Sequence, residues 1–209
     1  DTHFYGYGLG WFLSDVKGHL QVQHSGGLIG TVTHFTLIPD LKLGIVVLTN
    51  QQSGAAFSTI TNSVKDAYLG VENRDWLKLY GDRNKKNEET FAKQKKDVYD
   101  KASKFKSDLK DDQFIGWYKD DWFGIVEVSK QGKGYRIISK SSPRLKGDLI
   151  PYSANSFVAK WDDRSYDADA FFILNFDENG KAVSAKMKPI SDVTDFSFDF
   201  EDLDLRKIN

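Results

Sequence analysis

The chain has 209 residues and a formal net charge of −1, with 29 Lys and Arg residues against 30 Asp and Glu residues. This balance argues against a nucleic-acid partner, because binding to phosphates depends on an excess of positive charge. The absence of cysteine excludes disulfides and thiolate metal sites, and no apolar run reaches the roughly 18 residues of a membrane-spanning helix. A hydrophobic content of 40% is enough for the packed cores of one large or two modest domains.

Three strands are expected in the N-terminal third of the chain. Leu20–His24 alternates apolar and polar residues, and Thr31–Ile38 is rich in β-branched and aromatic residues, both of which are typical of strands. Leu43–Leu48 is a nearly continuous apolar run, which predicts a central strand covered on both faces. Pro39 marks the turn before it, because proline fixes φ where no ladder donor is needed.

The segment between the first two strands, HSGGLIG at residues 24–30, carries residue types that suit a catalytic site. Three glycines in five residues allow a positive φ or a close approach of the backbone to another group. An imidazole titrates near neutral pH, with an ordinary pKa of about 6.5. A serine hydroxyl can bind a carboxylate or a carbonyl, and a glycine N–H can point at a developing oxyanion. The alternative is that His24 is an ordinary strand residue with a satisfied hydrogen bond and that the glycines form a β-bulge.

A helix is expected at Ala55–Leu69, where apolar residues recur at three- and four-residue spacing. Residues 74–110 carry 12 basic and 7 acidic side chains. We interpret them as the solvated face of a helix that bridges two domains, rather than as a nucleic-acid or membrane surface. Asn73 is a candidate N-cap for this helix, and Gly81 and the polar run Asn84–Asn87 are candidate interruptions of it. Its apolar stripe consists of Phe91, Val98, Ala102, Phe105 and Leu109.

Residues 111–209 are predicted to form strands and turns throughout. Runs rich in aromatic or β-branched residues recur about every ten residues, and they are separated by turn sequences such as QGKG at residues 131–134. This spacing predicts an antiparallel barrel or a strongly bent sheet. The eight expected strands are Phe114–Lys119, Trp122–Ser129, Tyr135–Ser139, Leu145–Tyr152, Ser156–Trp161, Ala168–Phe176, Ala182–Ile190 and Phe196–Asp204.

The acidic residues of this segment are interpreted as a solvated surface rather than as a metal site. A calcium site needs several oxygens that converge on one point, whereas acids that alternate along a strand are spread about 7 Å apart. No metal and no cofactor are therefore predicted. The acids concerned are Asp162, Asp163, Asp167 and Asp169 around a turn and Asp199, Glu201, Asp202 and Asp204 along the last strand. The aromatic residues that either fill the barrel or line a ligand cavity in it are Trp117, Trp122, Trp161, Phe171 and Phe198.

The motifs of the first segment resemble those of the serine β-lactamase-like family, which includes class C β-lactamases, D-alanyl-D-alanine carboxypeptidases and related esterases. HSGG at residues 24–27 is followed by a second strand, a proline-containing turn and GIVVLTN at residues 44–50, and YGLGW at residues 7–11 precedes it. The resemblance implies that this segment takes the place of the family's third active-site motif, on a strand that walls one side of the cleft. It implies catalytic roles for His24 and for the Gly27 N–H as oxyanion donor, and substrate-binding roles for Ser25 and Gly26.

The family's nucleophile motif, Ser-x-x-Lys, and its Tyr-x-Asn motif have no counterpart before His24. Two stretches match the letters of Ser-x-x-Lys, one from Ser103 to Lys106 and one from Ser107 to Lys110. Both follow the third motif and lie in a Lys-rich polar stretch. The chain is therefore expected to be the C-terminal portion of a hydrolase that is inactive alone, because it lacks the nucleophile and its base.

The last segment resembles a lipocalin-like domain of unknown function that is often appended to serine β-lactamase-like proteins. The motifs that carry this resemblance are FIGWY at residues 114–118, NGKAV at residues 179–183 and DFSFDF at residues 195–200. The expected fold class is therefore α+β. Residues 1–73 would supply the antiparallel strands and C-terminal helix of a β-lactamase-like domain, residues 74–110 a charged helical linker, and residues 111–209 a lipocalin-like barrel of about eight strands.

Two functions are left open by these motifs. In the first, the chain supplies the third motif of a serine hydrolase for a small-molecule amide, ester or peptide substrate, and its partner is the missing N-terminal catalytic portion of the same protein. In the alternative, the chain is a non-catalytic binding or structural module whose barrel caps the enzyme or binds a small apolar or cell-wall ligand. No nucleic-acid partner is expected in either case, nor a transmembrane segment in this chain, and an exported or periplasmic bacterial location is expected.

Overall fold

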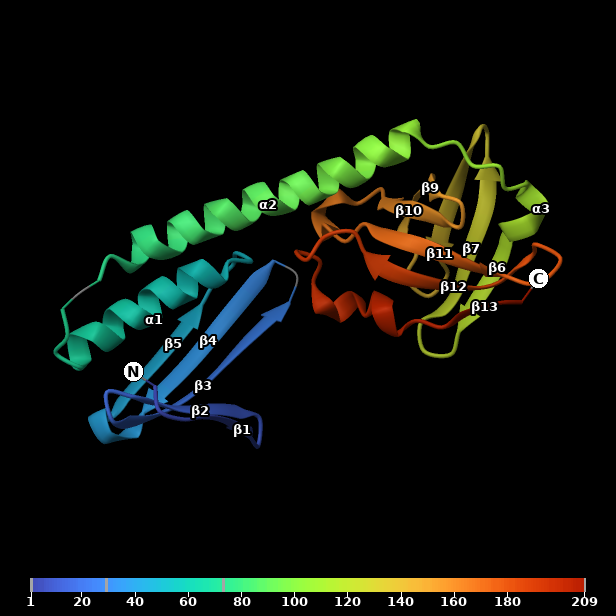
Figure 1. The fold of residues 1–209 in the computed structure, drawn as a ribbon. Helices are drawn as coiled ribbons and strands as arrows, with labels where there is room; N and C mark the ends of the chain where they lie inside the picture. The colour runs from blue at the N-terminus through green and yellow to red at the C-terminus, as the bar shows by residue number, and fades with distance from the viewer. Residues whose placement is uncertain (1, 29, 73, 209) are drawn as a thin grey trace. The chain divides into compact units, whose positions relative to one another are not determined.

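The computed structural model describes residues 2–28, 30–72 and 74–208, which belong to two compact units, Asp1–Glu88 and Glu89–Asn209. The first unit holds an antiparallel five-stranded sheet with helices, and the second holds a closed antiparallel barrel of eight strands (Figure 1). The α+β fold class predicted from the sequence is confirmed. Asn73, the predicted N-cap, lies outside the described residues.

The sheet of the first unit follows the chain in order, because each strand pairs with the next one. Its strands are β1 (Tyr5–Gly8), β2 (Trp11–Val16), β3 (His19–Leu28), β4 (Thr31–Ile38) and β5 (Leu43–Leu48). The bounds of β4 and β5 are those predicted, whereas β3 continues through the glycines to Leu28. Its pairing with β4 is continuous from Val22–Leu37 to Leu28–Thr31, so the alternative of a β-bulge at the glycines is wrong.

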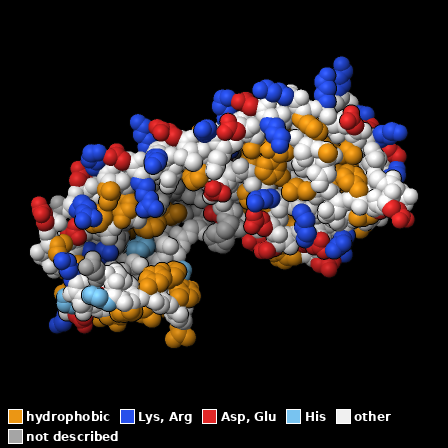
Figure 2. All heavy atoms as spheres, viewed as in Figure 1, with side chains coloured by type: hydrophobic (Ala, Val, Ile, Leu, Met, Phe, Trp, Pro, Cys, Tyr) orange, Lys and Arg blue, Asp and Glu red, His pale blue; other side chains and the backbone are white. Residues whose placement is uncertain are grey.

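Strand β5 lies at the edge of this sheet and is covered on one face within the described chain. Helix α1 (Gly54–Tyr68), found one residue earlier than predicted at both ends, packs on that face, where alternate side chains of Leu43–Val47 are buried. On the other face, Val46 and Leu48 are 58% and 75% exposed, and Figure 2 shows exposed apolar side chains gathered over this unit. The prediction of a strand covered on both faces is therefore wrong, because no described element covers the second face.

Helix α2 (Trp76–Lys104) is a single helix of 29 residues. It runs without a break through Gly81 and Asn84–Asn87, so the predicted interruptions are wrong. A glycine in a helix interior costs only about 1 kcal/mol, which long flanking helical segments offset. Phe105 and Leu109, the last two residues of the predicted stripe, lie beyond the end of α2. None of the helices in the described ranges is both long and apolar enough to cross a membrane.

The second unit is a closed barrel in which every strand pairs antiparallel with its neighbours. A short helix, α3 (Asp111–Phe114), precedes the strands. The strands are β6 (Gly116–Asp120), β7 (Gly124–Gln131), β8 (Gly134–Ser139), β9 (Lys146–Ser153), β10 (Ser156–Trp161), β11 (Ala170–Phe176), β12 (Ala182–Pro189) and β13 (Leu205–Lys207). The first seven lie on predicted runs, with ends shifted by at most two residues. β13 closes the barrel between β12 and β6.

The eighth predicted strand, Phe196–Asp204, is wrong. This segment forms two 3-10 turns, η3 (Phe196–Phe198) and η4 (Phe200–Asp202), and β13 begins only at Leu205. Asp199, between the two turns, adopts a left-handed φ of 48°, which an extended strand does not contain. The predicted row of acids that alternate along a last strand therefore does not exist.

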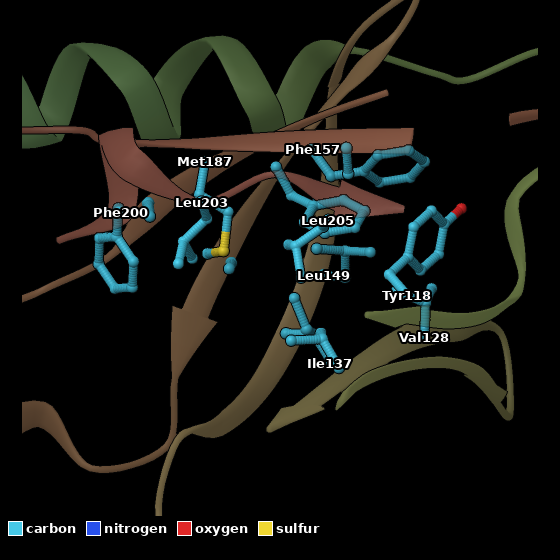
Figure 3. Close-up of a cluster of buried hydrophobic side chains, with 14 of the residues drawn as sticks. Tyr118, Val128, Ile137, Leu149, Phe157, Met187, Phe200, Leu203 and Leu205 are labelled. Carbon is cyan, nitrogen blue, oxygen red and sulfur yellow. The ribbon is translucent and has the colours of Figure 1, made fainter. Parts of the chain in front are cut away.

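The interior of the barrel is filled by buried aromatic and aliphatic side chains (Figure 3). Trp161, one of the aromatic residues considered for a cavity, is buried in this core, whereas Trp117 and Trp122 are 41% and 70% exposed. These two tryptophans therefore do not line the interior. The largest fully buried aromatic side chains are Tyr118, Phe114, Phe157, Phe172 and Phe200.

The second half of α2 belongs to this unit, and Tyr99 on it is hydrogen-bonded to a buried carboxylate of the barrel. The hydroxyl of Tyr99 donates to Asp169, which is 3% exposed. The guanidinium of Arg164 donates to both oxygens of the same carboxylate, at 2.7 and 2.6 Å, and the main-chain N–H of Trp161 donates to it at 3.0 Å. Burial and the adjacent Asp169 carboxylate raise the pKa of Tyr99, so the phenol keeps the proton that it donates.

A barrel fragment that starts at Glu89 is expected to be more stable than one that starts at Asp111. The shorter fragment lacks Tyr99, so the buried Asp169 loses a donor, which costs on the order of 1–3 kcal/mol or several degrees in the unfolding midpoint. Both fragments should give a cooperative thermal transition by circular dichroism, because the eight strands share one core. Equal midpoints would show that the helix does not stabilise the barrel.

Candidate active site

The predicted site residues lie in the second half of β3, where the strand has a partner on one side. β2 pairs with β3 only as far as Phe12–Gln23. β4 pairs with β3 as far as Leu28–Thr31. Residues 24–28 therefore form an edge that no described strand covers, and we call this stretch the open edge of β3.

The N–H of Gly27 points to the open edge. Gly27 lies opposite Val32 on β4. The carbonyl of Val32 accepts a hydrogen bond from the N–H of Thr49 at 3.1 Å, and its N–H donates to Oγ1 of Thr49 at 3.4 Å. The main-chain groups of Val32 are thus directed toward β5, which makes Gly27–Val32 a non-hydrogen-bonded antiparallel pair. In such a pair both residues direct their N–H and C=O groups outward, so those of Gly27 face the open edge.

Ser25 and Gly26 alternate in the same ladder, and both are exposed. The main chain of Gly26 faces β4, where Oγ1 of Thr33 donates to its carbonyl at 3.4 Å. The main chain of Ser25 faces the open edge, as that of Gly27 does. A Cβ added at Gly27 would meet β4 atoms at an ordinary contact distance of 3.5 Å. A small side chain would therefore fit at residue 27, and the group that this residue offers to a ligand is its main-chain N–H.

The ring of His24 is half-buried among aromatic side chains from two other strands. Its Nε2 lies 3.3 Å from the hydroxyl of Tyr7 on β1. The ring of Phe12 stacks on the imidazole, with centroids 5.5 Å apart and planes at 17°, and the ring of Trp11 approaches edge-on at 6.5 Å. The open edge thus begins at an imidazole with a defined orientation. A hydrogen-bonded strand histidine without a catalytic role would make the same contacts, so the role of His24 stays a prediction.

The sequence motifs do not identify Tyr7, Phe12 and Trp11 as neighbours of His24. The available signal was the density of aromatic residues in FYGYGLGWF, residues 4–12, immediately before the His-Ser-Gly motif. That density indicates ring contacts, but the partners depend on the register of β1, β2 and β3, which the sequence does not contain.

A second histidine, His34, lies opposite Ser25 on β4 and turns toward α1. Its Nδ1 lies 3.3 Å from the hydroxyl of Thr61 on that helix, and its ring stacks on that of Phe57 with centroids 4.7 Å apart and planes at 3°. These contacts place His34 in the packing between sheet and helix rather than at the open edge.

The remaining histidines each contact one carboxylate. Nδ1 of His3 lies 2.8 Å from Asp15, and the hydrogen bonds from His3 lower the pKa of this carboxyl to about 2. Nδ1 of His19 lies 3.4 Å from the exposed carboxylate of Asp40. Both histidines have local structural partners, which makes them suitable reference positions.

Within the described ranges there is no group of three or more His, Cys, Asp or Glu side chains that could hold a metal ion. Most of the acids considered as ligands are paired with a cation instead. These pairs are Asp162 with Arg136, Asp163 with Arg144, Asp167 with Lys95, Asp169 with Arg164 and Asp204 with Arg206.

The second unit has an open surface pocket of about 590 Å³ beside the exposed Trp122. Its volume lies within the range typical of ligand sites. The sequence does not predict this pocket, because the pocket combines the β6–β7 turn with the segment that is expected to be a last strand. Its lining consists of Lys119, Asp120, Asp121, Trp122, Asp199, Asp202, Asp204, Arg206 and Ile208.

Two family models match the chain, one described as "Beta-lactamase" at residues 3–68 and one described as "Domain of unknown function (DUF3471)" at residues 100–207. They confirm the prediction of a β-lactamase-like segment followed by an appended domain of unknown function. The more specific prediction, that this barrel is lipocalin-like, stays a prediction. A comparison with curated proteins gives no match.

Solved structures with similarity to the chain include the octameric penicillin-binding protein homologue from Pyrococcus abyssi, with 18% identity and a TM-score of 0.31. A crystal structure of SurE is similar with 12% identity and a TM-score of 0.37. Each alignment covers 97% of this chain and 37% of the other, so the chain spans little more than a third of the length of these proteins.

The packing of His34 predicts a pH-dependent stability of the first unit. Burial lowers the pKa of His34, and the charges of Lys65 and His24 lower it further. The unfolded chain therefore takes up a proton near the ordinary histidine pKa of about 6.5 that the folded unit does not bind. The stability contributed by neutral His34 is present above that pH and is lost as the pH falls below it.

Native-state hydrogen exchange of β4 and β5 amides should therefore give a lower opening free energy about one pH unit below 6.5 than about one unit above it. His34→Gln should weaken this dependence, whereas His19→Gln, at an exposed ion pair, should retain it. The same dependence in all three proteins would contradict the assignment to His34.

Proposed function

Because this chain belongs to the family of the domain of unknown function DUF3471 and its residues 3–68 match the β-lactamase family, we propose that it is the C-terminal portion of a serine hydrolase. The parent protein is of the β-lactamase, D-alanyl-D-alanine carboxypeptidase or esterase type, and the chain supplies the His-Ser-Gly motif to its cleft. The observation that carries this proposal is the open edge of β3, which the N–H of Gly27 faces.

In this proposal Gly27 is the oxyanion donor. When a serine oxygen attacks the carbonyl carbon of an amide or ester, a new C–O bond forms and the π electrons of the C=O bond move to its oxygen. An N–H that a strand already holds in place can donate to that oxygen without reorganising, and one such donor typically contributes a factor of about 10²–10³ in rate.

In this proposal the residues next to Gly27 bind the substrate and take part in proton transfer. His24 lies at the edge of the cleft, within reach of the substrate or of the groups that activate the nucleophile. The hydroxyl of Ser25 hydrogen-bonds a substrate carbonyl or carboxylate, and Gly26 gives the substrate access to the strand. The substrate class is a small-molecule amide, ester or peptide.

The nucleophile and its base come from the missing N-terminal portion of the same protein, since no Ser-x-x-Lys or Tyr-x-Asn motif precedes His24. Ser103 and Ser107, which begin the two stretches with matching letters, belong to the other compact unit. Oγ of Ser103 donates to the carbonyl of Asp100 in α2, and Oγ of Ser107 accepts from the N–H of Leu109. These local contacts are those of ordinary helix-end and loop residues.

We also propose that the parent protein is bacterial and is exported or periplasmic.

A second candidate function is that of a binding module, which the pocket beside Trp122 favours. Its exposed indole can stack on a small apolar or cell-wall ligand, as aromatic side chains do in many ligand sites. The filled interior of the barrel indicates that such a ligand would bind on the outside. A parent sequence without the two upstream motifs would favour this function over hydrolysis.

The chain by itself is expected to be catalytically silent. With the Gly27 donor but no nucleophile, it should give only background hydrolysis of a chromogenic β-lactam and of an activated short-chain ester. Turnover that persists through purification and disappears in His24→Ala would show that a nucleophile lies within this chain.

The oxyanion role is tested in the full-length protein by a substitution that removes the main-chain N–H of residue 27 and keeps the course of the strand. Gly27→Pro deletes the donor at an edge position where β4 does not use it, so kcat should fall by about 10²–10³. Gly27→Ala keeps the N–H and should retain most of the rate. His24→Ala should lose on the order of 10², and His19→Ala should lose little.

The thermal unfolding midpoint of each variant, compared with that of the wild type, shows whether a loss of rate comes from a loss of the fold. If Gly27→Pro and His24→Ala both remained folded and matched the wild-type rate, the assignment of the open edge to the active site would be wrong.

A further inference from the structure

Tyr7 belongs to a part of the first unit to which the proposed function assigns no role. It lies on β1, two strands away from His24 on β3, and its side chain crosses over β2 to reach the imidazole. Its hydroxyl lies 3.3 Å from Nε2 of His24, and its ring packs against that of Phe12 with centroids 4.6 Å apart. The contact therefore depends on the first three strands together.

The orientation of the imidazole is held on more than one side. Phe12 stacks on it nearly in parallel, and Trp11 lies nearly perpendicular to it and packs in turn against Phe35 on β4, with centroids 5.5 Å apart. These contacts hold the plane of the ring, and a flip within that plane would replace Nε2 by Cε1 and remove the acceptor that lies next to Tyr7. Packing thus defines the ring plane, and the 3.3 Å contact with the Tyr7 hydroxyl distinguishes Nε2 from Cε1 at that position.

The chemistry of the two groups indicates which of them donates the hydrogen bond. A phenol keeps its proton at neutral pH and is a better donor than acceptor, because its oxygen lone pair is delocalised into the ring. A neutral imidazole has one N–H and one acceptor nitrogen, and the hydrogen bond at one nitrogen decides which of them carries the proton. An O–H donated to Nε2 therefore leaves the proton on Nδ1.

We propose that Tyr7 is a positioning residue that fixes His24 in its Nδ1–H tautomer. Within the part of the chain that the structure describes, Nδ1 of His24 has no hydrogen-bond partner, so this N–H remains available to the cleft. His24 then acts on the substrate or the nucleophile network as a hydrogen-bond donor through Nδ1, while Nε2 is occupied by Tyr7. The tautomer is inferred from the Tyr7–His24 contact and from the phenol acting as its donor, whereas its use in catalysis rests on the proposed function.

The tautomer can be measured on this chain without any catalytic activity. Long-range ¹H–¹⁵N correlation spectra, recorded about two pH units above the ordinary histidine pKa of about 6.5, report which ring nitrogen carries the proton. The signals of His24 are those that disappear in His24→Ala. The wild-type chain should show His24 mainly as the Nδ1–H form, and Tyr7→Phe, which keeps the ring and removes the hydroxyl, should shift most of the population to Nε2–H.

Tyr5→Phe is the matched control. Tyr5 lies on the same strand and stacks on Phe12 with centroids 5.6 Å apart, so this variant also removes one exposed phenol hydroxyl beside the same ring. It should leave the His24 tautomer unchanged. A wild-type spectrum of the Nε2–H form, or the same tautomer in the wild type and Tyr7→Phe, would overturn the proposal.

Kinetics of the full-length protein test the catalytic consequence. A catalytic histidine in the wrong tautomer is costly, so Tyr7→Phe should lower kcat at least about tenfold with little change in KM, and Tyr5→Phe should not. If the tautomer shifts as expected and kcat does not, Tyr7 fixes the His24 tautomer, and the proposed use of that tautomer in catalysis is wrong. If the full-length protein hydrolyses nothing, the proposed function fails, while the spectra still decide the tautomer.

Discussion

The separation of β2 from β3 halfway along β3 is the constraint on which the candidate site depends. A β3 paired on both sides along its whole length would direct the N–H of Gly27 into a hydrogen bond with a neighbouring strand. Because the β2 pairing stops at Phe12–Gln23, the first half of β3 is held on two sides and the second half on one. The site residues thus extend from a rigid sheet while their main-chain groups remain accessible.

Local sequence patterns were sufficient for most of the fold. β4, β5 and β10 have the predicted bounds, because each combines a run of β-branched or aromatic residues with a clear turn signal on at least one side. The two main errors have different causes. The apolar run of β5 indicates how much side-chain surface needs cover, but not whether an element within the described chain supplies it. The alternation in Phe196–Asp204 has the period of a strand, yet Asp199 adopts a left-handed φ and the segment folds into two turns.

For the candidate site, the sequence indicated residues to consider but not their geometry. The spacing of His24, Ser25 and the glycines, together with the family resemblance, indicated which residues to consider. The direction of the Gly27 N–H depends on whether the pair with Val32 is hydrogen-bonded, and this is a property of register across β3, β4 and β5. The contact with Tyr7 depends on the register of the other side of the sheet. Both are long-range properties, which residue types and spacing alone do not contain.

The strand that closes the barrel has a consequence for how the second unit moves. β13 contributes two residue pairs to β12 and two to β6, whereas β11 and β12 share seven. Local opening takes place where few ladder hydrogen bonds have to break, so the seam on either side of β13 is where the closed barrel becomes an open, curled sheet most easily. Leu205, which is fully buried, is the side chain of β13 that opposes this opening. The pairing of the three residues of β13 therefore keeps the barrel closed. When this pairing is lost, β6 and β12 have unpaired edges to which another strand can pair.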